Sequence, residues 1–193
     1  MLKLEDFKAA KKRVDEVILP THLIHSDAFS EECGNDVYIK PENLQKLGAF
    51  KIRGAYNKIM KLDDEAKKKG LIASSAGNHA QGVAYAAKKL GVKATICMPA
   101  HTPLIKVDAT KAHGADVVLY GEAYDEAYEK AVELQKSEGY TFVHPFDDED
   151  VMEGQGTIAL EIMEELPDVD YILVPIGCLL YTSPSPRDRT RSR

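Results

Sequence analysis

The sequence has no tryptophan and only 3 cysteines, and no apolar run approaches the roughly 20 residues that a membrane-spanning helix needs. The cysteines form no Cys-x-x-Cys pair and are odd in number, which argues against a disulfide framework and a structural zinc site. The N-terminus, MLKLEDFKAAKKR, alternates charged and apolar residues and lacks the apolar segment of a signal peptide. We therefore expect a cytoplasmic protein with no membrane partner and no bound metal.

The composition is that of a globular chain with an acidic bias. Of its 193 residues, 44% are hydrophobic and 29% are charged, which is enough to bury the core of one domain, or of one domain and part of another. The formal net charge is -6, which argues against a nucleic-acid partner. The charge is unevenly distributed, because residues 178–193 hold four of the six arginines and leave the first 177 residues at -9.

Residues 178–193 differ in character from the rest of the chain. They read CLLYTSPSPRDRTRSR and show neither helical nor strand periodicity. The string resembles the translated read-through of a sequencing adapter, and we expect a non-native or disordered tail there. A basic arm that binds RNA or a membrane is the alternative interpretation. Such binding would weaken steeply with salt and would be lost on deleting the tail.

Upstream of the tail, strand patterns alternate with helix patterns. Apolar residues at helical spacing predict helices over 4–17 and about 157–165. Short apolar runs, separated by stretches long enough for a helix, predict strands at 71–75, 94–98, 116–120, 141–143 and 171–177. Strands joined by helical crossovers form a parallel sheet that is covered on both faces. The expected fold class is therefore α/β, with a doubly wound parallel sheet.

In a doubly wound sheet, ligands bind where strands end. The predicted strand at 71–75 is followed by Ala76, Gly77, Asn78 and His79 and then by a helical stretch. A tight turn into a helix exposes backbone N–H groups, which suit a phosphate or a carboxylate. A turn with a purely structural purpose has the same pattern, and a histidine at a helix start is often only a cap. Both interpretations stay open on pattern alone.

A second segment, at 41–59, places a lysine in an unusual position. Gly48 and Ala49 allow a sharp turn, and the helical stretch that follows puts Lys51 near a helix N-terminus. The helix dipole and the nearby charge of Arg53 both oppose a cation there and favour the neutral amine. A neutral amine is what imine chemistry requires. The alternative is that Lys51 is an ordinary lysine on a solvated helix face.

Taken together, the motifs resemble those of one enzyme family. PENLQKLGAFKIRGA at 41–55, SSAGNHAQG at 74–82, GQGT at 154–157 and VPIG at 174–177 occur in the order and at the spacing typical of threonine dehydratases. These enzymes, also called threonine ammonia-lyases, are related to serine dehydratases and use pyridoxal 5'-phosphate. The resemblance covers the chain as far as Gly177. It implies the tryptophan synthase beta-like architecture of fold-type II enzymes.

The resemblance implies a role for each residue of these motifs. Lys51 would bind pyridoxal 5'-phosphate as a Schiff base, Phe50 would lie against the pyridine ring, and Asn78 would donate to the cofactor's 3'-oxygen. The substrate carboxylate would bind at the turn formed by Ser75, Ala76, Gly77, Asn78 and His79. The implied reaction removes water and then ammonia from L-threonine, giving 2-oxobutanoate, and from L-serine, giving pyruvate.

Two positions discriminate within the family or depart from it. Related serine racemases carry an acid–base serine where this chain has Ala76, so elimination is expected over racemisation. Relatives continue after Gly177 with a glycine-rich loop that binds the cofactor phosphate, whereas residues 178–181 are bulky here. The phosphate-binding loop is therefore expected to be missing. A truncated fragment without catalytic activity is the alternative to an active deaminase.

The family layout also implies a division of the chain. Residues 1–51 would begin the large cofactor-binding domain, residues 52–150 would form a small α/β domain, and residues 151–177 would resume a large domain that is incomplete. Such a remnant is expected to expose an apolar face and to aggregate. Relatives are usually dimers or tetramers, so we expect the parent protein to be a homo-oligomer.

Overall fold

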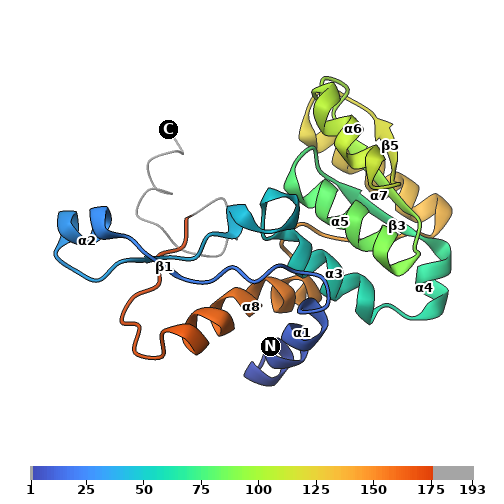
Figure 1. Cartoon of the computed structure of the whole chain (residues 1–193). Helices are drawn as coiled ribbons and strands as arrows, with labels where there is room; N and C mark the ends of the chain where they lie inside the picture. Colours follow the sequence, from blue (N-terminus) through green and yellow to red (C-terminus); the bar gives the residue numbers. More distant parts are fainter. Residues whose placement is uncertain (1, 176–193) are drawn as a thin grey trace, which may run out of the picture.

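The computed structural model describes residues 2–175, which form two groups of packed elements (Figure 1). The helices are α1 (Leu4–Val14), α2 (Asp27–Cys33), α3 (Lys51–Lys61), α4 (Asp64–Lys69), α5 (Asn78–Leu90), α6 (Leu104–Ala112), α7 (Tyr124–Glu138) and α8 (Glu149–Glu165). The strands are β1 (Ile24–His25), β2 (Tyr38–Ile39), β3 (Leu71–Ser74), β4 (Ala94–Met98), β5 (Asp116–Leu119) and β6 (Thr141–Phe142). Two short 3₁₀ helices, η1 (Glu42–Leu44) and η2 (Lys46–Gly48), precede α3.

The first group is built on a four-stranded parallel sheet with the strand order β5-β4-β3-β6. The chain runs from β3 outward through β4 to β5, and then returns to place β6 on the other side of β3. Leu71 pairs with Ala94 on one side and with Thr141 on the other, which fixes the register of the three strands. The reversal between β3 and β6 is the switch point of a doubly wound sheet. The predicted α/β class is therefore confirmed.

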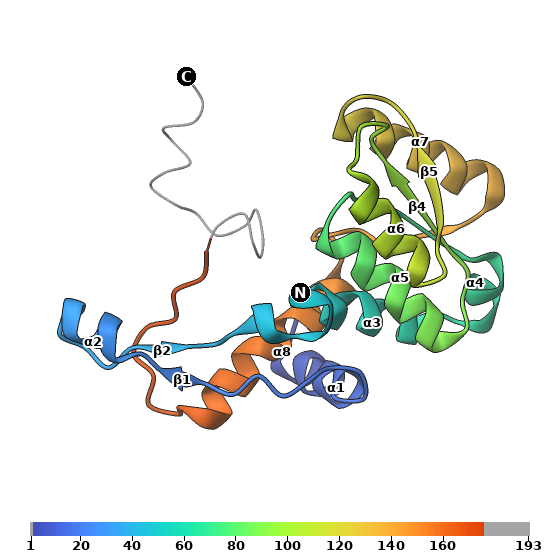
Figure 2. The same cartoon turned by 45° about the horizontal axis from the view of Figure 1, so that its top comes forward.

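Helices cover both faces of this sheet, as the parallel arrangement requires (Figures 1 and 2). In β3, Leu71 and Ala73 belong to the larger core cluster, which also contains the buried side of α5. Ile72 points to the opposite face and packs with Ala131 of α7. Side chains of a strand alternate between the two faces of the sheet. Because helices cover both faces, β3 is buried along its whole length. Residues 71–73 are accordingly an apolar run without alternation.

The second group comprises α1, α3 and α8, with an extended arm formed by β1, α2 and β2 (Figure 2). Since α3 packs against both α5 and α8, it joins the two groups. Glycine faces glycine where α3 meets α8: a Cβ on Gly154 would lie 2.5 Å from the Arg53 carbonyl oxygen and 2.6 Å from the Gly54 Cα. The GQGT motif therefore serves a close approach of two helix backbones.

Three predicted elements differ from those observed. The helix expected over 4–17 ends at Val14. The helix expected at about 157–165 begins already at Glu149, because the Asp148 side chain accepts hydrogen bonds from two N–H groups of the first turn. The strand expected at 171–177 is wrong for residues 171–175, which pair with no strand in the described part of the chain. A strand forms only where a neighbour supplies partners for its backbone groups. The rest of that segment and the tail lie outside the described residues.

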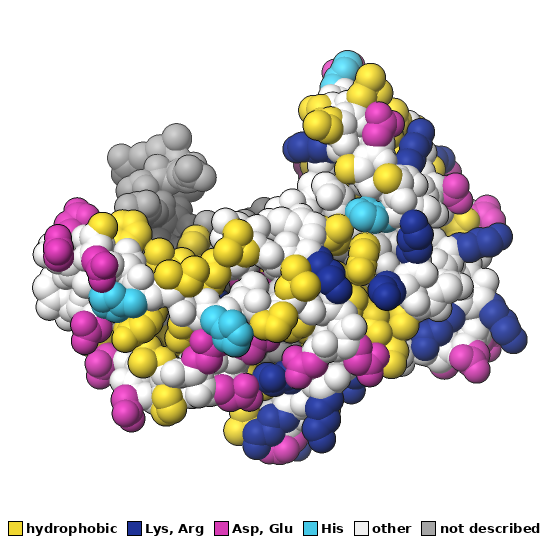
Figure 3. Space-filling model, viewed as in Figure 1, with side chains coloured by type: hydrophobic (Ala, Val, Ile, Leu, Met, Phe, Trp, Pro, Cys, Tyr) yellow, Lys and Arg dark blue, Asp and Glu magenta, His cyan; other side chains and the backbone are white. Residues whose placement is uncertain are grey.

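The arm and the segment after α8 expose large hydrophobic side chains. Ile24 and Phe29 are 50% and 54% exposed, and Leu173 is 93% exposed. Hydrophobic side chains gather over the arm in the space-filling view (Figure 3). These exposed side chains lie in the segments 1–51 and 151–177, for which an exposed apolar face is expected, whereas their assignment to a large domain and their aggregation stay predictions. Of the helices in residues 2–175, none is long and apolar enough to cross a membrane.

Candidate active site

The candidate site lies at the switch point of the sheet, where the chain leaves the carboxyl ends of β3 and β6. The turn at 75–79 follows β3, and the loop at 143–148 follows β6 and leads into α8. Lys51 Nζ donates a hydrogen bond of 2.8 Å to the Pro145 carbonyl oxygen, which brings the start of α3 to the same place. Three segments that are far apart in the sequence therefore meet where doubly wound sheets bind ligands.

Lys51 is the first residue of α3, as the turn pattern predicts. The chain enters this helix through a tight turn in which Gly48 has φ 69° and Leu47 has φ 67°. A non-glycine residue in the left-handed region costs about 1–3 kcal/mol, so neighbouring contacts must hold the turn. The Gln45 side chain provides such contacts, because it accepts from the Leu19 N–H at 2.7 Å and donates to the Leu19 carbonyl oxygen at 2.8 Å.

The Lys51 amine has a defined position between a carbonyl group and an aromatic ring. Its Nζ lies 5.2 Å from the centroid of the Phe50 ring, which is a cation–π distance. Phe50 is buried, so the ring has a fixed position beside the amine. At the N-terminus of α3 the helix dipole opposes a positive charge. The carbonyl and the ring thus attract the charged amine, whereas the helix disfavours it.

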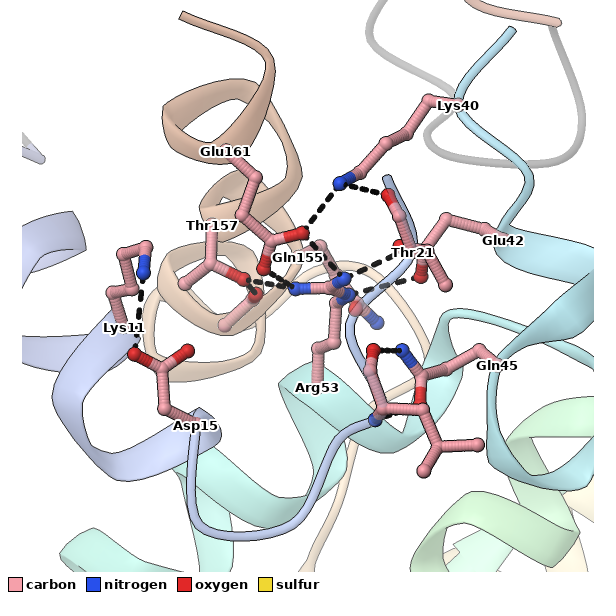
Figure 4. A network of polar contacts seen from close by, with 12 residues as sticks. Lys11, Asp15, Thr21, Lys40, Glu42, Gln45, Arg53, Gln155, Thr157 and Glu161 are labelled. Atoms are coloured by element: carbon pink, nitrogen blue, oxygen red, sulfur yellow. Dashed lines mark hydrogen bonds and ion pairs between the residues drawn. The ribbon is translucent and has the colours of Figure 1, made fainter. Parts of the chain in front are cut away.

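The expectation that Arg53 places a second charge beside Lys51 is wrong. Arg53 is fully buried and donates hydrogen bonds to Glu42 and Glu161 (Figure 4). Its Nη2 lies 2.8 Å from Glu42 Oε1 and 2.9 Å from Glu161 Oε2. Burial alone would lower the pKa of the guanidinium, but these hydrogen bonds outweigh burial and raise the pKa. Because two carboxylates neutralise Arg53, the helix dipole remains as the predicted influence against a charged Lys51 amine.

Arg53 belongs to a polar network that ties α3 to α8 and to the arm (Figure 4). Lys40 Nζ lies 2.7 Å from Glu161 Oε2, and the Thr21 hydroxyl donates to Glu42 Oε1 at 2.6 Å. Two cations, Arg53 and Lys40, thus face two carboxylates in a largely buried place. A buried charge destabilises the fold strongly unless its partner is present and hydrogen-bonded to it. The network therefore fixes the helix that begins with the site lysine.

The turn after β3 offers backbone N–H groups, as predicted. The Gly77 N–H donates to Ser75 Oγ at 3.2 Å. The hydrogen bond of Gln81 to the Gly77 carbonyl oxygen, 3.4 Å, is the first one that closes a turn of α5. The N–H groups of Asn78 and His79 come before it and need acceptors from outside the helix. A Cβ added to Gly77 would meet nothing within 4 Å, so the space over the turn is open and suits an anion.

His79 points toward β6, and its ring is buried with 3% of the residue exposed. Its Nε2 lies 2.9 Å from the Val143 carbonyl oxygen, and Nε2 carries the hydrogen because a carbonyl oxygen only accepts. Nδ1 is then a bare acceptor, and it has no hydrogen-bond partner within the described residues. Burial lowers the pKa of His79 to about 4, with smaller contributions from the charges of Lys51 and His144. The ring is therefore uncharged at neutral pH.

The loop after β6 is a part of the site that the sequence analysis does not identify. His144 Nδ1 accepts hydrogen bonds from the Asp147 N–H at 2.7 Å and from the Phe146 N–H at 3.3 Å, which braces the loop internally. Burial lowers the pKa of His144, so Nδ1 remains an acceptor at neutral pH. A usable signal exists in the sequence, since the loop follows the predicted strand at 141–143 and ligands bind where strands end.

The structure brings the predicted site residues together. A Cβ on Gly82 of α5 would lie 3.2 Å from the Lys51 carbonyl carbon, so α3 and α5 begin side by side. Lys51 and Phe50 therefore lie next to the turn at 75–79, in which Asn78 is exposed. The segment after Gly177, where the absence of a glycine-rich loop is expected, lies outside the described residues.

Comparison with known proteins identifies relatives along most of the chain. The family model described as pyridoxal-phosphate dependent enzyme matches residues 14–178. The chain is 54% identical over 177 residues to the L-threonine ammonia-lyase of Thermotoga maritima, an alignment that covers 92% of this chain and 44% of that protein. It is 46% identical over 174 residues to the catabolic L-threonine dehydratase of Escherichia coli, covering 90% and 53% respectively. The chain spans about half the length of the curated relatives it matches.

Solved structures show the same fold. The processed form of threonine deaminase isoform 2 from Solanum lycopersicum matches with a TM-score of 0.83 at 46% identity, covering 86% of this chain and 45% of that chain. Serine racemase from Dictyostelium discoideum matches with a TM-score of 0.83 at 37% identity, covering 88% and 55% respectively. The expected fold type II is thereby confirmed. The motifs, the fold and the matched family model together show that the chain belongs to the family of pyridoxal-phosphate dependent enzymes.

Proposed function

We propose that this protein deaminates L-threonine, and also L-serine, with pyridoxal 5'-phosphate, and releases ammonia with 2-oxobutanoate or pyruvate. The observation that carries the proposal is the position of the Lys51 amine at the switch point, beside the N-terminal turn of α5. Relatives at 54% and 46% identity are named threonine ammonia-lyase and threonine dehydratase, which supports this reaction. Since the chain spans about half the length of these relatives, the proposal concerns the whole protein.

The described residues fit the cofactor. Lys51 supplies a primary amine for an aldehyde, and the buried ring of Phe50 lies 5.2 Å from that amine, where a planar ring would bind. A Cβ on Gly77 would meet nothing within 4 Å, so the turn after β3 is uncrowded at this residue. When bound, the cofactor supplies an electron sink that stabilises negative charge at the Cα of the amino acid. The position expected to contact the cofactor phosphate follows Gly177, outside the described residues.

Each residue of the site has a proposed task. The N–H groups at the start of α5, from Asn78 and His79, bind and orient the substrate carboxylate, because a helix N-terminus attracts anions. The amide side chain of Asn78 donates to the cofactor's 3'-oxygen. The Lys51 amine removes the proton from the substrate Cα and holds it at Nζ. The His79 ring is assigned no proton transfer, because its only ring N–H donates to Val143 and its bare Nδ1 is buried, with burial lowering the pKa of the ring to about 4.

Racemisation is a second candidate, which the similarity to a serine racemase suggests. Inversion at Cα needs a second acid–base group on the substrate face opposite the lysine. The family resemblance assigns that task to a serine at the position of Ala76, and the methyl group of Ala76 carries no transferable proton. We therefore propose elimination as the main reaction and slow racemisation at most.

The division of the chain implied by the family is part of the proposal. Residues 52–150 would form the small domain, and residues 1–51 and 151–177 would contribute to the large domain. The position of the parallel sheet within residues 71–142 supports this division. A homo-oligomer, either a dimer or a tetramer, is also proposed for the whole protein. Light scattering on that protein measures the oligomeric state directly.

The proposal is tested by turnover of the whole protein on L-threonine and L-serine, with the 2-oxo acid and ammonia measured together. Equal amounts of both products are expected, and Lys51→Ala should lower the rate by about 10²–10⁴-fold or more. Lys93→Ala is the matched control, because Lys93 is an exposed lysine away from the switch point. If neither amino acid yields a 2-oxo acid, the proposal is wrong. Formation of D-serine at a comparable rate would instead favour racemisation.

The same assay on the 193-residue chain decides whether this part of the protein is sufficient for catalysis. An inactive 193-residue chain beside an active whole protein would identify it as a fragment without catalytic activity. An active chain would show that the described residues, with those that follow Gly177 here, already bind the cofactor and substrate.

A further inference from the structure

The loop at 143–148 is held by two helices at once. His79, at the start of α5, donates from Nε2 to the Val143 carbonyl oxygen at 2.9 Å. Lys51, at the start of α3, donates from Nζ to the Pro145 carbonyl oxygen at 2.8 Å. The two acceptors are only two residues apart on one loop. A displacement of the first carbonyl therefore moves the second one, to which the site lysine is bound.

The loop between these two acceptors is stiff enough to transmit such a displacement. His144 Nδ1 accepts from two N–H groups further along the loop, those of Phe146 and Asp147. At one end, the Val143 N–H donates to the Ile72 carbonyl oxygen at 2.8 Å, which continues the sheet. At the other end the loop runs into the capped start of α8. The segment thus has few internal degrees of freedom.

The two anchoring helices are also fixed relative to each other. A Cβ on Gly82 would lie 3.2 Å from the Lys51 carbonyl carbon, so the backbones of α3 and α5 are in direct contact. The backbone of Lys51 is thereby fixed to α5. The amine at the end of its side chain donates to the Pro145 carbonyl group, which lies two residues from the carbonyl group that His79 binds.

The two ring nitrogens of His79 differ in their contacts, and only the hydrogen bond to Val143 uses the polarity of the ring. Nε2 donates its hydrogen bond to the Val143 carbonyl oxygen, while Nδ1 is buried without a hydrogen-bond partner among residues 2–175. A buried acceptor without a partner is unfavourable, so an apolar side chain would fill the same space at lower cost. The polar contribution of His79 within the described structure is therefore its one hydrogen bond to the loop.

We propose that His79 is a positioning residue for Lys51, acting through the Val143 and Pro145 carbonyl groups of the loop after β6. The inference rests on the proposed function in one respect, namely that Lys51 is the reactive amine. Through the loop, His79 sets where the Lys51 amine stands and how strongly a carbonyl oxygen binds it. A hydrogen bond to the charged form of an amine stabilises that form, so the loop also tunes the proton affinity of the amine.

Three substitutions of His79 separate this role from simple packing. His79→Gln keeps an N–H donor at the same reach from the backbone as Nε2, and His79→Asn places its donor closer to the backbone. His79→Leu keeps volume without any donor. The readouts are measured on the full chain without cofactor: hydrogen exchange of the backbone amides of residue 144 and residues 146–148, and the pH profile of Lys51 acetylation with Lys93 as internal reference. Circular dichroism verifies that each variant is folded.

For His79→Leu and His79→Asn we expect hydrogen exchange in the loop to accelerate by about tenfold, the change that loss of one hydrogen bond produces. The pH midpoint of Lys51 acetylation should shift toward lower pH, while that of Lys93 stays fixed. His79→Gln should keep the exchange rate of the loop within about twofold of wild type and return the pH midpoint of Lys51 acetylation to the wild-type value. If His79→Leu does not fold, the comparison of His79→Asn with His79→Gln decides the question by itself.

The inference is overturned if the folded Asn or Leu variant leaves both the loop and Lys51 unchanged, or if the Gln variant behaves like the other two. Neither readout involves cofactor or turnover. A protein that shows the expected shifts but forms no 2-oxo acid would therefore refute the proposed function and leave the positioning role of His79 intact.

Discussion

Replacing Arg53 by methionine should destabilise the fold strongly. Arg53 is fully buried and donates to Glu42 and Glu161, so Arg53→Met keeps the apolar stem of the side chain but leaves these two carboxylates without the guanidinium. Removing one partner of a buried ion pair costs about 3–5 kcal/mol. Domains are stable by only about 5–15 kcal/mol, so this loss is a large fraction of the total. We expect the free energy of unfolding at pH 7 to fall by about 3–5 kcal/mol.

The loss of stability in Arg53→Met should also depend on pH, and the pKa of Glu161 determines the direction of this dependence. Burial raises the pKa of Glu161, but its hydrogen bonds from Arg53 and Lys40 outweigh burial and bring the pKa below its ordinary value of 4.5. A carboxylate with a lowered folded-state pKa stabilises the fold above its unfolded-state pKa, and that contribution is lost as the pH falls through the folded-state value. The difference between wild type and Arg53→Met should therefore be largest near neutral pH and shrink below about pH 4.5.

Urea unfolding followed by circular dichroism measures this difference at each pH. Lys8→Met is the matched control, because Lys8 forms a 3.0 Å ion pair with Glu5 on the exposed face of α1. Exposed pairs contribute about 0–1 kcal/mol, so the control should lose little stability. A loss for Arg53→Met no larger than that for Lys8→Met at pH 7 would refute the description of the network as buried and charge-balanced.

Three further predictions concern packing, protonation and thiol reactivity. Gly154→Ala should lower the free energy of unfolding by about 1–3 kcal/mol, because its Cβ would meet helix backbone, whereas a Cβ on Gly77 has open space and should matter much less; urea titration compares the two variants. Burial holds the pKa of His79 at about 4 in the fold, against 6.5 ordinarily, so the unfolded state binds the extra proton between these values. Between pH 6.5 and 4, the free energy of unfolding should then fall by up to about 3 kcal/mol more in wild type than in His79→Gln. The same pH dependence of this free energy in both proteins would contradict the prediction. Burial raises the pKa of Cys97 to about 11, so a thiol reagent at pH 8 should modify the exposed Cys33 and spare Cys97 until the chain unfolds, as peptide mass spectrometry would show.

The parallel sheet is predictable from sequence because its signal is local. Each of β3, β4, β5 and β6 is a short apolar run with a helical stretch on both sides, and all four are recovered to within one residue. The placement of Lys51 at the start of α3 is also local, since the turn through Gly48 determines it. The strand expected at 171–177 is wrong over the described residues 171–175, because strand formation depends on a partner, which a sequence window does not contain.

The surroundings of the site depend on contacts between distant residues, and local patterns do not reveal them. Arg53 lies two positions from Lys51 in sequence, but its partner Glu161 is more than a hundred residues further on. Its charge is therefore neutralised by a residue that no local argument includes. The contact of Lys51 with Pro145 is of the same kind, because it requires knowing that β6 returns to the side of β3.

The central claim is that Lys51 is the amine that bonds to pyridoxal 5'-phosphate, and reductive trapping tests it most directly. The whole protein is mixed with the cofactor, reduced with borohydride, digested and analysed by mass spectrometry. The account predicts one dominant cofactor-labelled peptide, which contains Lys51, and loss of that label in Lys51→Arg. Labelling spread evenly over the exposed lysines, or an unlabelled Lys51 beside another strongly labelled lysine, would contradict it.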